Sequence, residues 1–156
     1  MYFIPVKKAR RAVLYLRKDP DFELGFPLSV QEESCRAYCA SSGLEVLGVI
    51  REHCGDEDSV ERIMNLLEKL PEGTDVLMAS SFTDYSHHLR YLGLAALLYM
   101  SRGVELCSED LPGPIRKHLP FIVPADYRES DKWRELPLPE AIQALKAYRK
   151  QRTIFQ

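Results

Sequence analysis

The sequence predicts an α/β fold: a single open, mostly parallel sheet of four to five strands with helices on both faces. Three observations indicate it. Short, mostly apolar runs recur along the chain, segments with apolar residues at helical spacing separate them, and glycine or proline marks their ends. Unbroken apolar strands are typical of parallel sheets, whose strands are connected by helices. The 156 residues suffice for one compact domain and are too few for two.

The N-terminal part is predicted to form a strand, a helix and a second strand. Residues 12–16 and 44–50 are the two apolar runs. Between them, Ser29 stands at an N-cap position and Glu32 completes a capping box. This pattern predicts a helix from Ser29 to about Ser41.

The middle of the chain repeats the alternation. Apolar residues at helical spacing predict a helix over residues 59–70, followed by a strand over 75–79. A strongly apolar helix is expected over 89–101, where Gly103 supplies the C′ residue. The fourth predicted strand covers residues 104–107.

The C-terminal part differs, because prolines recur there and exclude long regular elements. A brief edge strand is expected at 121–123 and a final helix over 140–151. We therefore expect an α/β domain of residues 1–110 and an extension, residues 111–156, that packs on the same domain.

The charge balance argues against tight autonomous DNA binding. The formal net charge is −2, whereas affinity for DNA comes mainly from clustered Lys and Arg. Basic runs are confined to residues 7–11 and 146–152, so any DNA contact is expected to be weak. The longest uncharged run, residues 91–101, is too short to span a membrane.

The cysteines show no Cys-x-x-Cys pair, and no signal peptide precedes them, which predicts reduced thiols and a cytoplasmic protein. They are Cys35, Cys39, Cys54 and Cys107. Cys35 and Cys39 lie one helical turn apart and could join His53 or His87 as metal ligands. Burial of small residues on a helix face is the favoured interpretation, so neither a metal nor a cofactor is expected.

Five short segments follow one another in the order of a known family. They are residues 11–17, 25–31, 36–38, 43–46 and 86–106. Arg-Ala-Val-Leu-Tyr-Leu-Arg at 11–17 resembles the first strand of the catalytic domain of serine recombinases, the resolvase and invertase family. Gly-Phe-Pro-Leu-Ser-Val-Gln at 25–31 resembles the Gly-Tyr-Ser-Leu-x-x-Gln entry to that domain's first helix. The resemblance covers residues 10–110 and implies the family's fold.

The resemblance also implies a reaction that this chain cannot perform in the family's way. There, a serine attacks a DNA phosphate, and several arginines neutralise the transition state. Asp19 stands at the serine position, and a carboxylate repels the phosphodiester and cannot form the required linkage. Of the family's arginines, Arg17 is retained.

The remaining catalytic positions are also changed. Residues 82–87 occupy the family's Leu-Asp-Arg-Leu-Ser-Arg motif: Thr83 replaces its acid, and Asp84 and His87 replace its two arginines. A further arginine position aligns with Val60, with Arg62 close by. The chain is thus expected to be a degenerate family member without catalytic residues, and its proline-rich C-terminal part lacks a DNA-reading motif.

Several polar side chains remain as candidates for binding a ligand or phosphate. They are Arg17, Gln31, Arg62, Ser80, Ser81, Ser86, His87 and His88. A relocated reaction around Ser80, Ser81, Asp84 and His87 is an alternative, although no Gly-x-Ser-x-Gly elbow supports it. A polar loop with helix-capping groups is the simpler interpretation.

Three functions stay open from the sequence. The leading hypothesis is a catalytically inactive binding or regulatory module, linked to DNA recombination or mobile elements, with a protein partner or a second copy of the chain. The second is an accessory protein that docks on an active recombinase or on DNA. The third is an enzyme with relocated chemistry. The fold alone does not decide among them.

Overall fold

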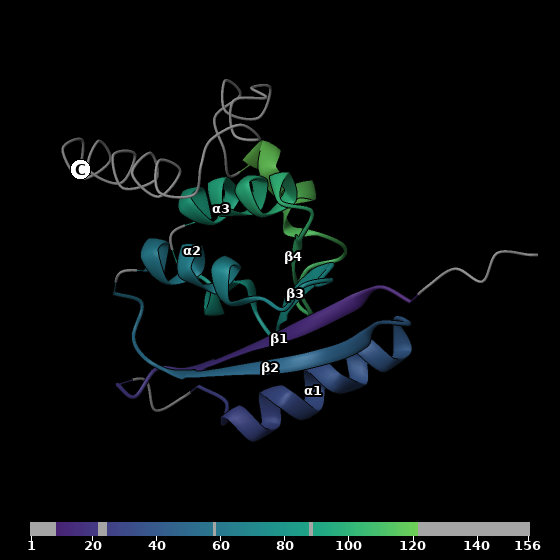
Figure 1. Ribbon diagram of the computed structural model, residues 1–156. Coiled ribbons are helices and arrows are strands. Elements are labelled where there is room, and N and C mark those ends of the chain that lie inside the picture. Colours follow the sequence, from purple (N-terminus) through teal and green to yellow (C-terminus); the bar gives the residue numbers. More distant parts are fainter. Residues whose placement is uncertain (1–8, 22–24, 58, 88, 122–156) are drawn as a thin grey trace, which may run out of the picture.

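The computed structural model describes residues 9–21, 25–57, 59–87 and 89–121, which form four strands, three α-helices and two short 3₁₀ helices (Figure 1). In chain order these are β1 (Arg11–Lys18), α1 (Leu28–Ser41), β2 (Glu45–His53), α2 (Ser59–Lys69), β3 (Val76–Ala79), η1 (Phe82–Asp84), α3 (Leu89–Ser101), β4 (Glu105–Ser108) and η2 (Ile115–Phe121).

The strands form one parallel sheet in the order β2-β1-β3-β4. The predicted α/β class is confirmed, with four strands. The central strand β1 pairs with β2 along its whole length, and Leu14 lies between Val49 on one side and Met78 on the other. The β1–β2 register shifts between Ala12 and Val13.

Helices cover both faces of the sheet, as predicted (Figure 1). On one face, α1 packs Cys35 and Cys39 against Leu14 and Leu16, and all four side chains are fully buried. On the other face, α2 and α3 bury the larger apolar cluster. Its biggest members are Tyr15, Ile63, Met64, Leu66, Leu77, Tyr85, Leu92, Leu98 and Tyr99.

The predicted capping box at Ser29 is wrong. The helix begins one residue earlier, at Leu28, with Pro27 as its N-cap residue and no side-chain capping bond. The Pro27 carbonyl accepts hydrogen bonds from the amides of Val30 and Gln31, both at 3.1 Å. The proline backbone therefore starts the helix, and Ser29 lies inside the first turn. The helix ends are as expected: Gly43 and Gly103 follow them with φ of 71° and 81°.

The described part of the C-terminal region packs on the α3 side of the sheet. Ile115, at the start of η2, is fully buried in the larger apolar cluster, and Pro114 forms an isolated bridge with Cys107. Phe121 belongs to η2 instead of beginning a strand. Residues 122–123 and the helix predicted over 140–151 lie outside the described residues. Within the described ranges, no helix is both long and apolar enough to cross a bilayer.

The Tyr85 hydroxyl joins two strands and provides a test of this packing. It is fully buried and lies 3.0 Å from the Leu77 carbonyl oxygen and 2.7 Å from that of Cys107. We expect Tyr85→Phe to lower the free energy of unfolding by about 1–2 kcal/mol, because buried carbonyls lose a donor. Tyr38→Phe, on the partly exposed side of α1, is the control and should change it by less than about 0.5 kcal/mol. Equal losses in urea titrations would contradict the assigned contacts.

Candidate functional site

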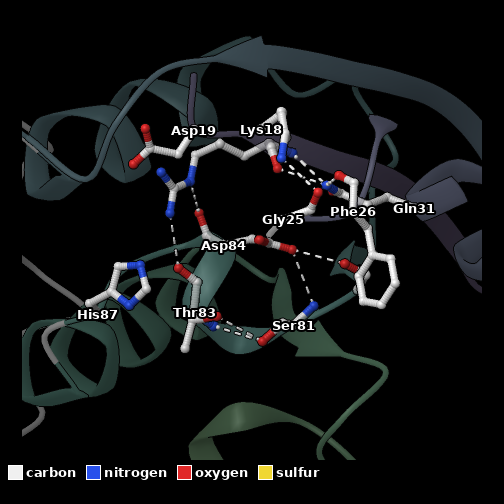
Figure 2. Close-up of a pocket in the computed structure, with 11 residues that line it drawn as sticks. Lys18, Asp19, Gly25, Phe26, Gln31, Ser81, Thr83, Asp84 and His87 are labelled. Atoms are coloured by element: carbon white, nitrogen blue, oxygen red, sulfur yellow. Dashed lines mark hydrogen bonds between the residues drawn. The ribbon is translucent and has the colours of Figure 1, made fainter. Parts of the chain in front are cut away.

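A pocket of about 290 Å³ opens at the carboxyl ends of β1 and β3 (Figure 2). The strand order explains its place. From β1 the chain goes to β2 on one side and then returns to β3 on the other, so the order reverses between β1 and β3. Open α/β sheets bind their ligands at such switch points. The pocket is therefore the candidate site on the basis of topology alone.

The pocket brings together most of the residues singled out in the sequence. Those that line it are Arg17, Asp19, Gln31, Ser80, Ser81, Thr83, Asp84 and His87, together with Lys18, Gly25 and Phe26. Arg62 and Ser86 are not among its lining residues. Ser86 is fully buried, and its hydroxyl lies 3.2 Å from that of Ser59, next to the start of α2. His88 lies outside the described residues.

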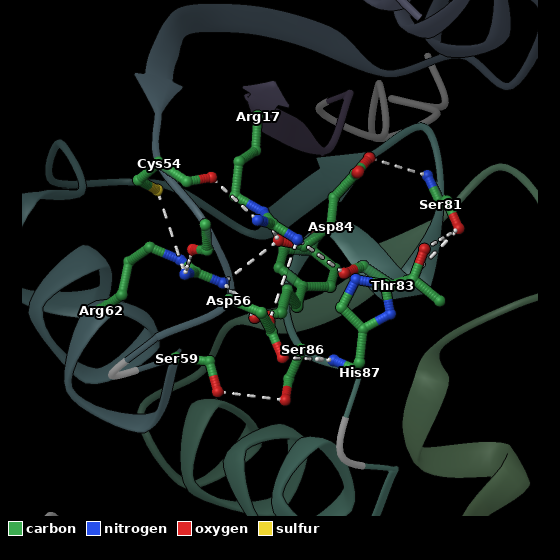
Figure 3. Close-up of polar contacts among 12 residues, drawn as sticks. Arg17, Cys54, Asp56, Ser59, Arg62, Ser81, Thr83, Asp84, Ser86 and His87 are labelled. Carbon is green, nitrogen blue, oxygen red and sulfur yellow. Dashed lines mark hydrogen bonds and ion pairs between the residues drawn. The ribbon is translucent and has the colours of Figure 1, made fainter. Parts of the chain in front are cut away.

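The Arg17 side chain, which is 4% exposed, is bound to backbone carbonyls. Its Nε donates to the Asp84 carbonyl oxygen at 2.8 Å. Its Nη1 donates to the carbonyl oxygen of Cys54 at 3.0 Å, and its Nη2 to that of Thr83 at 3.2 Å. The guanidinium thus connects the end of β1 to the loops that follow β2 and β3 (Figure 3).

Arg62 approaches the same place from α2 and is engaged in a similar way (Figure 3). Its Nη1 donates to the Gly55 carbonyl oxygen at 2.9 Å and its Nη2 to that of Tyr85 at 2.6 Å. The side chain is 10% exposed, and among the described residues its buried Nε has no hydrogen-bond partner.

Asp56 supplies an internal counterion for both arginines. Its Oδ1 lies 3.8 Å from Arg17 Nη2 and 3.7 Å from Arg62 Nη2. Its Oδ2 accepts a hydrogen bond from the backbone amide of His87 at 3.3 Å. The carboxylate therefore occupies the space beside both guanidinium groups that an external anion would need in order to bind them.

Asp19, at the position of the family's serine, is partly exposed at the pocket. Its Oδ1 accepts a hydrogen bond from the Asp21 amide at 2.9 Å, which closes a turn after β1.

Gln31 has a structural role at the opposite wall. Its side-chain amide exchanges hydrogen bonds with the backbone of Arg17, at 3.2 and 2.8 Å, and so joins α1 to β1.

Asp84 caps the short helix η1. Its Oδ2 accepts hydrogen bonds from the Ser80 hydroxyl at 3.0 Å and from the Ser81 amide at 3.2 Å. Burial raises the pKa of this carboxyl above its ordinary value, and the hydrogen bonds from Ser80 and Ser81 oppose the rise only in part.

The two serines are arranged for capping. Ser80 donates to Asp84, and the Ser81 hydroxyl donates to Asp110 Oδ2 at 2.9 Å. Across the described ranges, no hydrogen bond joins the His87 ring to either serine. A nucleophile activated by histidine needs such a contact, so the geometry gives the relocated reaction no support.

Three acidic residues near the pocket were not singled out from the sequence. Asp56 follows β2, while Glu109 and Asp110 follow β4. The sequence did contain a signal for them, because all three follow predicted strands and parallel strands place their carboxyl ends at one edge of the sheet.

The part of the chain that the structure describes contains no cluster of three or more His, Cys, Asp or Glu residues suited to a metal ion.

Three solved structures share this fold over most of the chain. The N-terminal catalytic domain of TP901-1 integrase is 12% identical, with a TM-score of 0.51 over 94% of this chain and 99% of that one. The C-terminal catalytic domain of ISC1926 TnpA, an IS607-like serine recombinase, is 15% identical, with a TM-score of 0.50 over 88% and 97%. A resolvase family site-specific recombinase from Streptococcus pneumoniae is 12% identical, with a TM-score of 0.53 over 93% of each chain.

These structures confirm the fold that the sequence resemblance implied. No protein-family model and no curated protein matches the sequence.

The role of Arg17 can be tested by a change that keeps its charge. A lysine ammonium lacks the planar fork that directs the N–H groups of Arg17 to three carbonyl oxygens. We therefore expect Arg17→Lys to lower the free energy of unfolding by about 1–3 kcal/mol, the cost of leaving a buried acceptor unsatisfied. The control is Arg51→Lys. Arg51 is 52% exposed, is also paired with a carboxylate, that of Glu32, and should lose less than about 0.5 kcal/mol. Similar decreases in the free energy of unfolding of the two variants, measured by chemical denaturation, would contradict the structural role of the Arg17 hydrogen bonds.

Asp84 gives a pH-dependent test. Because its pKa is raised on folding from an ordinary 3.8, the folded state holds the proton more tightly than the unfolded state. The stability of the natural protein relative to Asp84→Asn should therefore be constant below pH 3.8 and should fall as the pH rises through the folded pKa. Unfolding free energies across this range test the sign, and ¹³C NMR titration of the carboxyl locates the pKa. A relative stability that rises with pH would refute the assignment.

Proposed function

We propose that this chain is a serine-recombinase-like domain that does not cleave DNA and instead acts as a binding or regulatory module. The observation that carries the proposal is the state of the two arginines. Arg17 and Arg62 bind backbone carbonyls and lie against Asp56, while Asp19 stands where a nucleophile is needed.

Phosphoryl transfer requires cationic donors that face the reacting phosphate. Losing a single preorganised donor typically costs about 10²–10³ in rate. Here a phosphate would have to displace Asp56 and compete with the carbonyl oxygens of Cys54 and Thr83. The carboxylates of Asp19 and Asp84 also line the pocket and disfavour an anion, while Lys18, which lines it too, donates through Nζ to the Gly25 carbonyl oxygen at 2.6 Å. Together these effects favour a site without strand-cleaving activity.

The proposed module would bind its partner at the carboxyl ends of the strands. The structural relatives include an integrase, a TnpA recombinase and a resolvase family recombinase, and we propose a regulatory role in the same area of DNA recombination. We also propose that residues 111–156 belong to the same unit as residues 1–110. The buried Ile115 supports this extension.

Strand cleavage tests the proposal directly. The natural protein and Asp19→Ser are incubated with supercoiled plasmids that carry random inserts, and covalent protein–DNA adducts are sought on denaturing gels. Neither protein should form an adduct, because restoring the hydroxyl leaves Arg17 and Arg62 engaged internally. An active resolvase family recombinase on its own site is the positive control. An adduct formed by the natural protein would refute the proposal.

A further inference from the structure

A second hollow, of about 420 Å³, lies beside the pocket, between the start of α1 and the end of β4. We name it the acidic groove. Its walls come from Phe26, Val30, Ser34, Ser81, Glu109 and Asp110. It shares Phe26 with the pocket, and Figure 2 shows this ring on the side away from His87.

The apolar wall of the acidic groove is exposed to solvent. Phe26 is 70% and Val30 45% exposed, and they are the two large hydrophobic residues found exposed in the described ranges. Both line the same hollow. Single exposed apolar residues are ordinary, but apolar residues grouped in a hollow with a polar rim mark a surface for another molecule.

The opposite wall carries two carboxylates, those of Glu109 and Asp110. Glu109 accepts a hydrogen bond from the Ser34 hydroxyl at 2.8 Å. Asp110 accepts three, from the Ser81 and Ser108 hydroxyls at 2.9 and 2.7 Å and from the Phe82 amide at 3.1 Å. No Lys or Arg of the described residues forms an ion pair with either carboxylate. The nearby arginine Arg17 is engaged elsewhere. The charge of the groove is therefore negative and complementary to a cation.

We propose that the acidic groove binds a segment of a partner protein in which a Lys or Arg lies beside an apolar side chain. The apolar side chain packs on Phe26 and Val30, and the cation approaches Glu109 and Asp110. DNA is disfavoured because its phosphates meet carboxylates. A free polyamine is disfavoured because it leaves the apolar wall uncovered. This inference rests on the proposed function, since it assigns a partner to the same end of the sheet.

Short peptides are suitable probes. Three acetylated pentapeptide amides are titrated into the ¹⁵N-labelled full chain: Ala-Leu-Arg-Leu-Ala, the same peptide with Gln for Arg, and the same peptide with Ser for both Leu. We expect the first to bind with a Kd of about 1 mM or tighter and to shift amide signals of residues 26–34 and 108–110. Each of the other two peptides should bind roughly tenfold more weakly, because one lacks the cation and the other the apolar contact.

Variants of the protein locate the site. Glu109→Gln keeps an acceptor for Ser34 but removes the charge, and Phe26→Ser removes the apolar wall. Each should weaken binding of the Leu-Arg-Leu peptide roughly tenfold. Glu72→Gln, exposed just before the amino end of β3, is the matched control and should leave the affinity unchanged. Thermal unfolding midpoints check that each variant is folded.

Several results would overturn the inference. The Arg and Gln peptides could bind with equal affinity, or the amide signals that shift could all belong to other residues. Glu109→Gln and Phe26→Ser could bind the Leu-Arg-Leu peptide as tightly as the natural protein does. Spermidine could also bind at the same amides as tightly as that peptide. These outcomes are separate from the failure of the proposed function, which would appear as a covalent DNA adduct in the cleavage assay whatever the peptide result.

Discussion

The loops that follow β2 and β3 are held to the end of β1 by the buried guanidinium of Arg17. Backbone carbonyls that leave a sheet and remain buried need donors, and an arginine offers five N–H groups in a fixed plane. Arg17 uses this geometry to bind the carbonyl oxygens of Cys54, Thr83 and Asp84. The shape of the pocket floor depends on this contact, because the pocket lies directly against these loops.

The same contact determines the charge that the pocket presents. A buried guanidinium requires an anion. Asp56 lies beside both Arg17 and Arg62, and the Glu52 carboxylate lies 4.0 Å from Arg62 Nε, so two carboxylates face two guanidinium groups. The positive charge is thereby compensated inside the fold. The carboxylates nearer the surface, those of Asp19, Glu109 and Asp110, have no cationic partner among the described residues and dominate this end of the sheet. The site thus holds Arg17 with its charge balanced internally, while the carboxylates of Asp19, Glu109 and Asp110 lie nearer the surface, with Lys18 also on the pocket lining.

The secondary structure was predictable where composition alone decides it. The helix at 89–101 was predicted with its observed bounds because it is strongly apolar and a glycine follows it. The strands β1 and β2 extend beyond their apolar segments. Backbone pairing does not depend on side-chain polarity, and Lys18 pairs with His53 at the end of the two strands. The start of α1 was misplaced because Pro27 caps the helix with its backbone.

The site was predictable only in part. The family resemblance implied that Arg17 and the loop of residues 82–87 would belong to one site, because both match catalytic positions of that family. The sequence could not indicate that Arg17 binds backbone carbonyl oxygens. Every residue has a backbone carbonyl group, so no residue type marks the acceptors. The role of Asp56 depends on a contact across 39 positions of the chain, and the acidic groove joins the start of α1 to the end of β4. Such pairings follow from the fold and not from local pattern.

The pocket and the acidic groove share the side chains of Phe26, Gln31, Ser80 and Ser81. A molecule that rotates the Phe26 ring on entering one hollow changes the volume left in the other. Thermodynamic reciprocity then requires that each occupant alter the affinity of the other by the same factor. Because the two hollows share this wall, a ligand that moves it from one side changes the space open to a ligand on the other side.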